Sequence, residues 1–449
     1  MSPRTVTTRT TVAAPPLSAD GFPFRQEDVR SRSSALGEPA WMLERRLRAW
    51  EAYERLPFPT NTEEAWRRTD LRTMPRPSLG LRPADGGPVD AELLRPLAGE
   101  THGALLCLTP GHVPRREGGK DLTRRDVVFT DWATAVREHS PLLERWMGNV
   151  VSDDEGHFAA LAGALASDGV LVHVPAGVHV SQPLHSVLWA PGGDRAFFTR
   201  LLIVVEDGAS VTYVHEAASP TEPEGHALHG GIVELVLGAG AQLTFVELQT
   251  WGEHVWNITH ERANVARDGR LDWIFGAVGS QVTKNFSELN LTGQGAEGRM
   301  SGFTFADGSQ HLDHDTQQNH LAPHTTSDLL FKGALIDRSR TVWQGMIYVA
   351  PGAQKSDGYQ ANRNLLLSPH ARADSIPGLE ILADDVRCTH GATVGQLEEE
   401  PIYYLMSRGL PRPDAERIVV DGFFAPIMER IPFAGVRARF ERMIDEKLP

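Results

Sequence analysis

Cysteine is nearly absent from this chain, with Cys107 and Cys388 the only two among 449 residues. So few thiols cannot form the disulfide framework that stabilises many small secreted domains. Cys107 lies in the apolar run Ala104–Leu108. We expect it to be a buried and inert thiol, because free cysteine is among the most buried residue types.

Long apolar runs and an excess of positive charge are also missing. No stretch approaches the roughly 18 apolar residues of a transmembrane helix, and the N-terminus lacks the apolar core of a secretory signal. The net charge is −14. Phosphate binding needs clustered Lys and Arg, so nucleic acid is not an expected partner. We expect a cytoplasmic protein without a membrane partner.

The motifs of several large enzyme classes do not occur. The sequence contains no G-x-x-x-x-G-K-[ST], G-x-S-x-G, H-E-x-x-H or C-x-x-C pattern. His215–Glu216 and His260–Glu261 begin like a zinc-protease motif but lack the second histidine. The chain therefore carries no visible ATPase motif of its own.

The texture of the sequence changes three times along the chain. Residues 1–25, rich in Thr, Pro and Ala, are typical of a disordered arm. Residues 26–150 contain apolar residues at helical spacing and predict a mostly helical domain. Residues 151–396 consist mainly of short β-branched runs and predict a β core. Residues 397–449 return to helical patterns and form the predicted C-terminal domain.

Within the predicted β core, turns with Gly before another residue recur at a nearly constant interval. They fall at Ala209, Ala241, Arg270, Ala296 and Ala353. The spacing is about 26 to 32 residues, except for a final gap of about twice that length, and such a period marks repeat architectures. The pattern favours a β-helix, or solenoid, whose rungs stack on one another. A two-sheet sandwich is the competing interpretation.

Cys388 and His390 stand two residues apart at the end of this β core. In a strand that spacing places both side chains on one face. Thiolate and imidazole can ligate iron or zinc, so the pair could address a metal or a partner surface. A buried cysteine and a hydrogen-bonded histidine in the last rung would give the same pattern.

Two further groups of histidines allow alternative interpretations. The first group is His311, Asp313, His314, Asp315, His320 and His324. Such side chains can bind Fe(II), Zn or Mn, but they can equally form hydrogen bonds along the stack or face solvent. A β-helix carbohydrate-active enzyme with an acidic metal site at Asp313 and Asp315 is therefore an alternative function. The second group, His173, His179 and His185, could form a ladder, but solvent-facing strand positions are favoured.

Three long segments resemble the SufB/SufD family of iron–sulfur cluster assembly proteins. They are EPAWMLERRLRAWEAYERLPFPTNTEEAWRRTDL near the start, HLDHDTQQNHLAPHTTSDLLFKGALIDRSRTVWQGMIYVAPGAQKSDGYQANRNLLLS in the core, and RCTHGATVGQLEEEPIYYLMSRGLPRPDAERIVVDGFF near the end. Together they span roughly residues 38 to 445. The resemblance implies a right-handed parallel β-helix core flanked by N-terminal and C-terminal helical domains.

The resemblance also implies a role and partners. Members of the family are non-catalytic scaffold subunits that pair with a SufB-like paralogue through the end of the β-helix. Their C-terminal helices bind a SufC-like ABC ATPase, which is where ATP hydrolysis is expected. No cofactor would be bound permanently; a transient iron–sulfur cluster, or iron, would be held at the paralogue interface. A homodimer is possible when the chain is alone.

The same resemblance suggests which residues act. The run from Cys388 to Thr393 matches SufD-like members, whereas SufB-like members have Cys-x-His-Glu-Ala-Thr and further cysteines. The histidine matching His390 is implicated in cluster assembly, so His390 is the expected interface residue and candidate iron ligand, with Cys388 secondary. The expected partner-binding stripe in the C-terminal helices is Ile418, Val419, Phe423, Ile427 and Met428.

Overall fold

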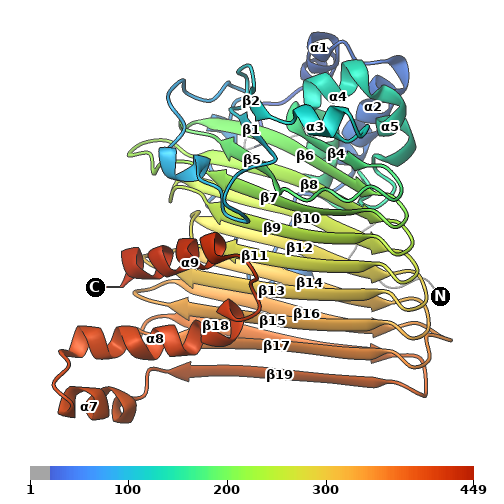
Figure 1. The fold of residues 1–449 in the computed structure, drawn as a ribbon. Helices are drawn as coiled ribbons and strands as arrows, with labels where there is room; N and C mark the ends of the chain where they lie inside the picture. The colour runs from blue at the N-terminus through green and yellow to red at the C-terminus, as the bar shows by residue number, and fades with distance from the viewer. Residues whose placement is uncertain (1–20, 449) are drawn as a thin grey trace.

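A computed structural model describes residues 21–448, and most of them belong to a β-solenoid of about eight turns (Figure 1). From β4 onward, successive strands alternate between two sheets, and each strand pairs in parallel with the strand two places later. This topology confirms a mainly β fold with a stacked solenoid core and rules out the sandwich. No helix among the described residues is long and apolar enough to cross a membrane.

The two sheets contain ten and nine strands. In spatial order, the ten-stranded sheet consists of β2 (Arg115–Gly118), β1 (Ala104–Leu108), β5 (Leu184–Trp189), β7 (Ser210–Ala218), β9 (Gln242–Thr250), β11 (Arg270–Ala277), β13 (Glu297–Ala306), β15 (Thr326–Leu335), β17 (Asp357–Leu366) and β19 (Arg387–Gln396). The nine-stranded sheet consists of β3 (Val128–Asp131), β4 (Asp168–Val174), β6 (Arg195–Val205), β8 (Ala227–Leu237), β10 (Val255–Val265), β12 (Val282–Leu291), β14 (His311–His320), β16 (Arg340–Val349) and β18 (Arg372–Ile381).

The corners that lead into the strands of the ten-stranded sheet share one backbone conformation. A residue with positive φ is followed by a small residue that is buried in the stack. The positive-φ residues are Gly208, Gly240, Asp268, Gly295, His324 and Lys355. The small residues that follow are Ala209, Ala241, Gly269, Ala296, Thr325 and Ser356. The double interval in the sequence is therefore filled by the rung that turns at Thr325.

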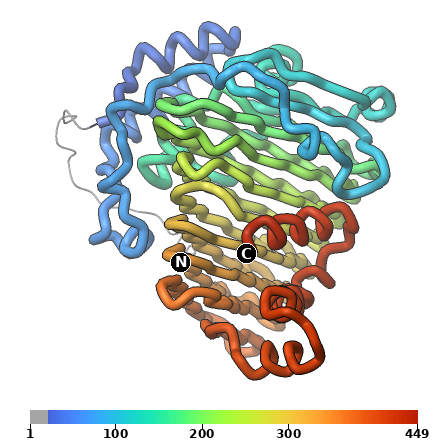
Figure 2. The backbone as a smooth tube through the Cα atoms, turned by 90° about the vertical axis from the view of Figure 1, so that its left-hand side faces the viewer, coloured from blue at the N-terminus to red at the C-terminus, as the bar shows by residue number. Residues whose placement is uncertain are grey.

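Helices cover the outer faces of the two sheets near opposite ends of the solenoid. The α-helices are α1 (Gln26–Leu36), α2 (Ala40–Arg55), α3 (Lys120–Thr123), α4 (Trp132–Glu138), α5 (Ser140–Trp146), α6 (His157–Leu165), α7 (Glu399–Ser407), α8 (Arg412–Met428) and α9 (Ala434–Lys447). Three short 3₁₀ helices are η1 (Glu64–Trp66), η2 (Arg76–Ser78) and η3 (Ala91–Leu94). Helices α1, α2 and α6 pack on the early strands of the nine-stranded sheet, whereas α8 and α9 pack on the later strands of the ten-stranded sheet (Figure 2).

The N-terminal region also contributes strands to the solenoid. Strands β1 to β3 fall within residues 26–150, which were expected to be mostly helical. Residues 21–25 belonged to the expected disordered arm, but Phe22 and Phe24 are buried and their rings stack 5.1 Å apart. Residues 21–25 are therefore not part of a disordered arm, and the rest of the predicted arm lies outside the described residues.

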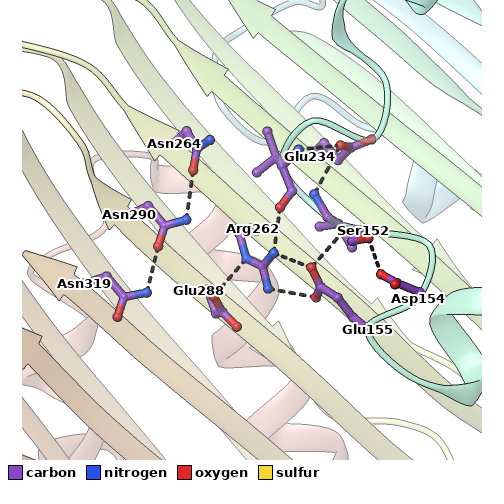
Figure 3. Close-up of polar contacts among 11 residues, drawn as sticks. Ser152, Asp154, Glu155, Glu234, Arg262, Asn264, Glu288, Asn290 and Asn319 are labelled. Carbon is purple, nitrogen blue, oxygen red and sulfur yellow. Dashed lines mark hydrogen bonds and ion pairs between the residues drawn. The ribbon is translucent and has the colours of Figure 1, made fainter. Parts of the chain in front are cut away.

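Buried ion pairs attach the loop before α6 to the nine-stranded sheet (Figure 3). The Arg262 guanidinium donates from Nε to Glu288 at 2.8 Å and from Nη2 to Glu155 at 2.8 Å. The Glu234 carboxylate accepts backbone N–H groups from Gly148 and Val150. Because these charges are paired at largely buried positions, removing one partner would leave a charge without compensation.

The last helix is attached to one of the first rungs. Arg439 of α9 lies 3.1 Å from Glu216 of β7, and His185 of β5 lies 3.0 Å from the same carboxylate. All three side chains are buried. The end of the chain is thus fixed by charge to strands made from its first half.

Candidate functional site

The solenoid ends at β18 and β19, which are the last strands of the two sheets. No later rung covers them in the part of the chain described, so interior-type apolar residues reach solvent. The exposed fractions are 37% for Leu379, 39% for Ile381, 43% for Leu382 and 44% for Val394. Leu379 and Ile381 pair in register with Ile347 and Val349, which are fully buried one rung earlier. We call this uncovered surface, with Cys388 and His390, the open end.

Cys388 lies on β19 and is half-buried. It packs beside Ile347 and Val349, which shows that its side chain points into the solenoid. A Cβ atom on Gly358, its register partner, would lie 3.3 Å from Cys388 Sγ and 3.1 Å from His320 Nε2. Burial raises the pKa of the Cys388 thiol. The thiol is therefore protonated and weakly nucleophilic at neutral pH.

His390 lies two residues further along β19 and is exposed. Its alternation with Cys388 places it on the inward face, at the rim of the open end. The strand register stacks it on Gln360, which stacks on Leu329 and then on Met300. Among the four, only His390 is exposed. The structure thus confirms the shared face of Cys388 and His390 but gives them different exposure.

The interior beneath the open end is polar. His320 is fully buried, and its ring nitrogens bond the hydroxyls of Thr325 at 2.7 Å and Ser327 at 2.8 Å. Burial lowers the pKa of His320 to about 4, so the imidazole is neutral at physiological pH. Its two nitrogens are both occupied by hydroxyl partners. His320 therefore supports the interior of the last rungs and is not a free ligand.

The other members of the predicted histidine–aspartate group do not gather at one place, because those on β14 lie on its two opposite faces. His311, Asp313 and Asp315 face outward, whereas His314 and His320 face inward. His324 occupies a corner with positive φ. Among residues 21–448, no group of three or more His, Cys, Asp or Glu side chains is arranged to hold a metal ion.

A lysine occupies the place where a metal ion would have to sit between the two aspartates. Lys284 Nζ lies 3.0 Å from Asp313 and 3.0 Å from Asp315, and all three groups are buried. Burial alone would lower the pKa of Lys284, but the two carboxylates raise it. Thr69 also donates to Asp313 and Gln344 to Asp315. This arrangement removes the acidic metal site on which the carbohydrate-active alternative depends.

The three histidines of the second group do not form a ladder. His173 lies on the nine-stranded sheet and bonds Glu206 at 3.1 Å, whereas His185 lies on the ten-stranded sheet beside Glu216. His179 is exposed and bonds Ser210. The preference for solvent-facing positions is wrong for His173 and His185, because each is buried against a carboxylate.

The C-terminal helices divide the predicted stripe between core and surface. Ile427 is fully buried against the solenoid, Val419, Phe423 and Met428 are partly buried, and Ile418 is 46% exposed. The exposed apolar residues of this region are Tyr403, Tyr404, Met406 and Ile418, which we call the α7–α8 patch. The two tyrosines were not among the predicted residues, although adjacent aromatic residues beside acidic ones are visible in the sequence.

Comparison with known proteins identifies the class. The model of the SUF system FeS cluster assembly SufBD core domain matches residues 188–423, and the model of the SufBD protein N-terminal region matches residues 28–185. The chain therefore belongs to the SufBD family of iron–sulfur cluster assembly proteins.

Within the family, the chain is a homologue of SufD. It is 32% identical to the iron–sulfur cluster assembly protein SufD of Bacillus subtilis (strain 168) over 438 residues, which cover 94% of this chain and 98% of that protein. It is 28% identical to a SufBD family protein of Staphylococcus haemolyticus, over 90% of this chain and 89% of the relative. A relative in Staphylococcus saprophyticus is 27% identical over the same shares.

Proposed function

We propose that this chain is a non-catalytic scaffold subunit of a SUF assembly complex, and that it pairs through its open end with a SufB-like paralogue. The supporting observation is the open end itself. Its edge strands leave backbone N–H and C=O groups unpaired, and its apolar side chains continue a buried core. Another chain that continued the two sheets would cover both.

In this proposal the iron–sulfur cluster, or the iron that enters it, is transient cargo at the paralogue interface. His390 stands at the rim of the open end with no hydrogen-bond partner among the described residues, so its imidazole is available as an iron ligand. Cys388 points inward and its thiol has a raised pKa. It is therefore secondary to His390 and contributes through packing beneath the interface.

The proposal places an ABC-type ATPase on the C-terminal helices. The α7–α8 patch offers four exposed apolar side chains on helices that are anchored to the solenoid by Val420, Phe424 and Ile427. ATP hydrolysis in that partner would move the helices and reshape the paralogue interface. The complex would work in the cytoplasm, and the chain alone would form a homodimer through the same open end.

The experiment is anaerobic purification of the complex with its SufB-like and ATPase partners, comparing wild type with His390→Ala. Iron and acid-labile sulfide are measured on complexes of verified composition. We expect the variant to assemble normally but to lose the cluster. His370→Ala is the matched control, because His370 is an exposed histidine at the corner before β18. A variant that keeps a full cluster contradicts the role of His390, and failure to co-purify with either partner contradicts the scaffold role.

A further inference from the structure

A buried glutamine lies directly beneath His390. Gln360 of β17 is fully buried, and the register of β17 and β19 pairs it with His390. Adjacent strands lie about 4.8 Å apart, so side chains at paired positions on one face are neighbours. Gln360 is therefore the register neighbour of His390 in the penultimate rung.

Its hydrogen bonds fix which way the amide of Gln360 points. Nε2 donates to the carbonyl oxygen of Gly378 at 2.9 Å and to that of Gly345 at 3.4 Å. Both partners are acceptors, so the NH₂ group must face them. The Oε1 atom accepts no hydrogen bond from any described residue although it is buried. Buried acceptors are rarely left unsatisfied, and this one lies in the rung below an unpaired histidine.

We propose that Gln360 Oε1 accepts an N–H from the His390 imidazole and thereby positions the iron ligand. The bond would fix one tautomer and direct the lone pair of the other ring nitrogen out of the open end. Ligating histidines commonly donate their second N–H to an oxygen acceptor that orients the ring. Gln360 is a positioning residue in this scheme, since it does not touch iron itself.

Part of the inference can be tested without a cluster or a partner. In the full-length chain with ¹⁵N-labelled histidine, long-range ¹⁵N–¹H spectra report the tautomer of His390, which is assigned by its absence in His390→Ala. We expect one dominant tautomer in wild type and a mixed or reversed population in Gln360→Met. Gln360→Glu as the neutral acid keeps an oxygen acceptor and an O–H donor for the Gly378 carbonyl oxygen, and it is expected to restore the wild-type tautomer.

Gln249→Met is the matched control. Gln249 is also a buried amide whose Nε2 donates to two acceptors, the Gly279 carbonyl oxygen and the Thr283 hydroxyl, but it lies on β9, four strands before β17 in the same sheet. Its substitution is expected to leave the His390 tautomer unchanged. An unchanged tautomer in Gln360→Met, or an equal change in Gln249→Met, overturns the positioning role.

A second readout uses the assembled complex and rests on the proposed function. Gln360→Met is expected to weaken iron retention about 10-fold or more, with the complex intact, as second-sphere substitutions at histidine ligands do. Wild-type iron retention in that variant, measured while His390→Ala has lost the cluster, overturns the positioning role alone. Retention of the cluster in His390→Ala overturns the proposed function instead, and the tautomer result stands separately.

Discussion

At the N-terminal end of the solenoid, both sheets stop at strands that run antiparallel to their neighbours, β2 beside β1 and β3 beside β4. Strand β2 is exposed and carries Arg115, Arg116 and Glu117. At the C-terminal end, β18 and β19 continue the parallel stack, and β19 has no charged residue between Cys388 and Gln396. Charged or irregular edges discourage further pairing. By this measure the N-terminal end disfavours further strand addition. At the C-terminal end, β18 carries Arg372, Asp374 and Pro377, whereas the uncharged edge of β19 supports the proposed pairing there.

The inward column that ends at His390 also changes along its length. It contains Leu184, Tyr213, Phe245, Trp273, Met300 and Leu329, and a buried amide first occurs in it at Gln360. Apolar packing in the earlier part of this column stabilises the fold. Inward-facing polar side chains occur in the early rungs as well, where Ser186 bonds His215 and Thr199 bonds His229, so the change belongs to this column and not to the interior as a whole.

A charge placed on the open end should have the largest effect of the substitutions considered. We expect Val394→Arg to abolish pairing with the paralogue, because burying an unpaired charge costs about 3–5 kcal/mol, or roughly 150- to 4,000-fold in affinity. Analytical ultracentrifugation with the purified paralogue measures the affinity. Val113→Arg is the control, since Val113 is 94% exposed and precedes strand β2 at the N-terminal end of the solenoid. Equal loss in both variants would contradict the assignment of the interface.

Two leucines that stack in one inward column should differ in how much stability is lost when each is shortened to alanine, because one lies in the core and the other at the open end. Leu289 is fully buried on β12, and Leu379 stands three rungs later on β18. We expect Leu289→Ala to lower the free energy of unfolding by about 2–5 kcal/mol. Leu379→Ala should cost under about 1 kcal/mol in the chain alone, because much of its side chain is already in water. Urea unfolding of both variants provides the measurement, and equal losses would show that the end is not open.

Lowering the pH should reduce the stability of the fold through protonation of His320. Its pKa is lowered from the ordinary 6.5 to about 4 by burial, so the unfolded chain binds the extra proton between those values. Stability from this group is therefore complete above pH 6.5 and is lost as the pH falls toward 4. Between pH 7 and pH 5 the loss is about 2 kcal/mol. The stability difference between wild type and His320→Gln should shrink by that amount, and a difference independent of pH would contradict it.

The smallest expected effect is a difference in alkylation rate between the two cysteines, one of which lies near each end of the solenoid. Cys107 on β1 is buried, Cys388 on β19 is half-buried, and burial raises the pKa of both thiols. We expect Cys388 to react with iodoacetamide at least about 10-fold faster than Cys107, because alkylation requires access to the thiolate. Mass spectrometry of the native chain measures both rates. Addition of the paralogue should protect Cys388 alone, and protection of neither thiol would contradict an interface at β19.

Much of the fold could be predicted from the sequence, because glycine marks most corners. The turns at Gly208, Gly240 and Gly295 were visible as Gly followed by Ala. The corner at Thr325 was missed because His324 takes the positive φ, which an L-residue adopts at a cost of roughly 1–2 kcal/mol. The Thr325 hydroxyl donates to the Ala322 carbonyl oxygen, so its hydrogen-bond donor has a partner inside the stack. A corner of this kind contains no glycine, so the sequence does not indicate its position.

The candidate site was only half visible in the sequence. The shared face of Cys388 and His390 follows from a spacing of two in a strand. The exposure of His390, the burial of Ile427 and the pairing of Lys284 with Asp313 depend on which rungs and helices lie next to each residue. Those neighbours are distant in sequence, so no local pattern identifies them. Gln360 was missed for the same reason, because its relation to His390 exists only in the strand register.

The contact of α9 with β7 has a consequence for biosynthesis. Solenoid rungs contact mainly their neighbours, so each can form as the chain leaves the ribosome. Glu216 belongs to an early rung, yet its guanidinium partner, Arg439, is in the last helix. The carboxylate can contact His185 of β5 from the start, but it gains its guanidinium partner only after Arg439 has been translated. The order of synthesis thus places the completion of an early rung after that of the open end.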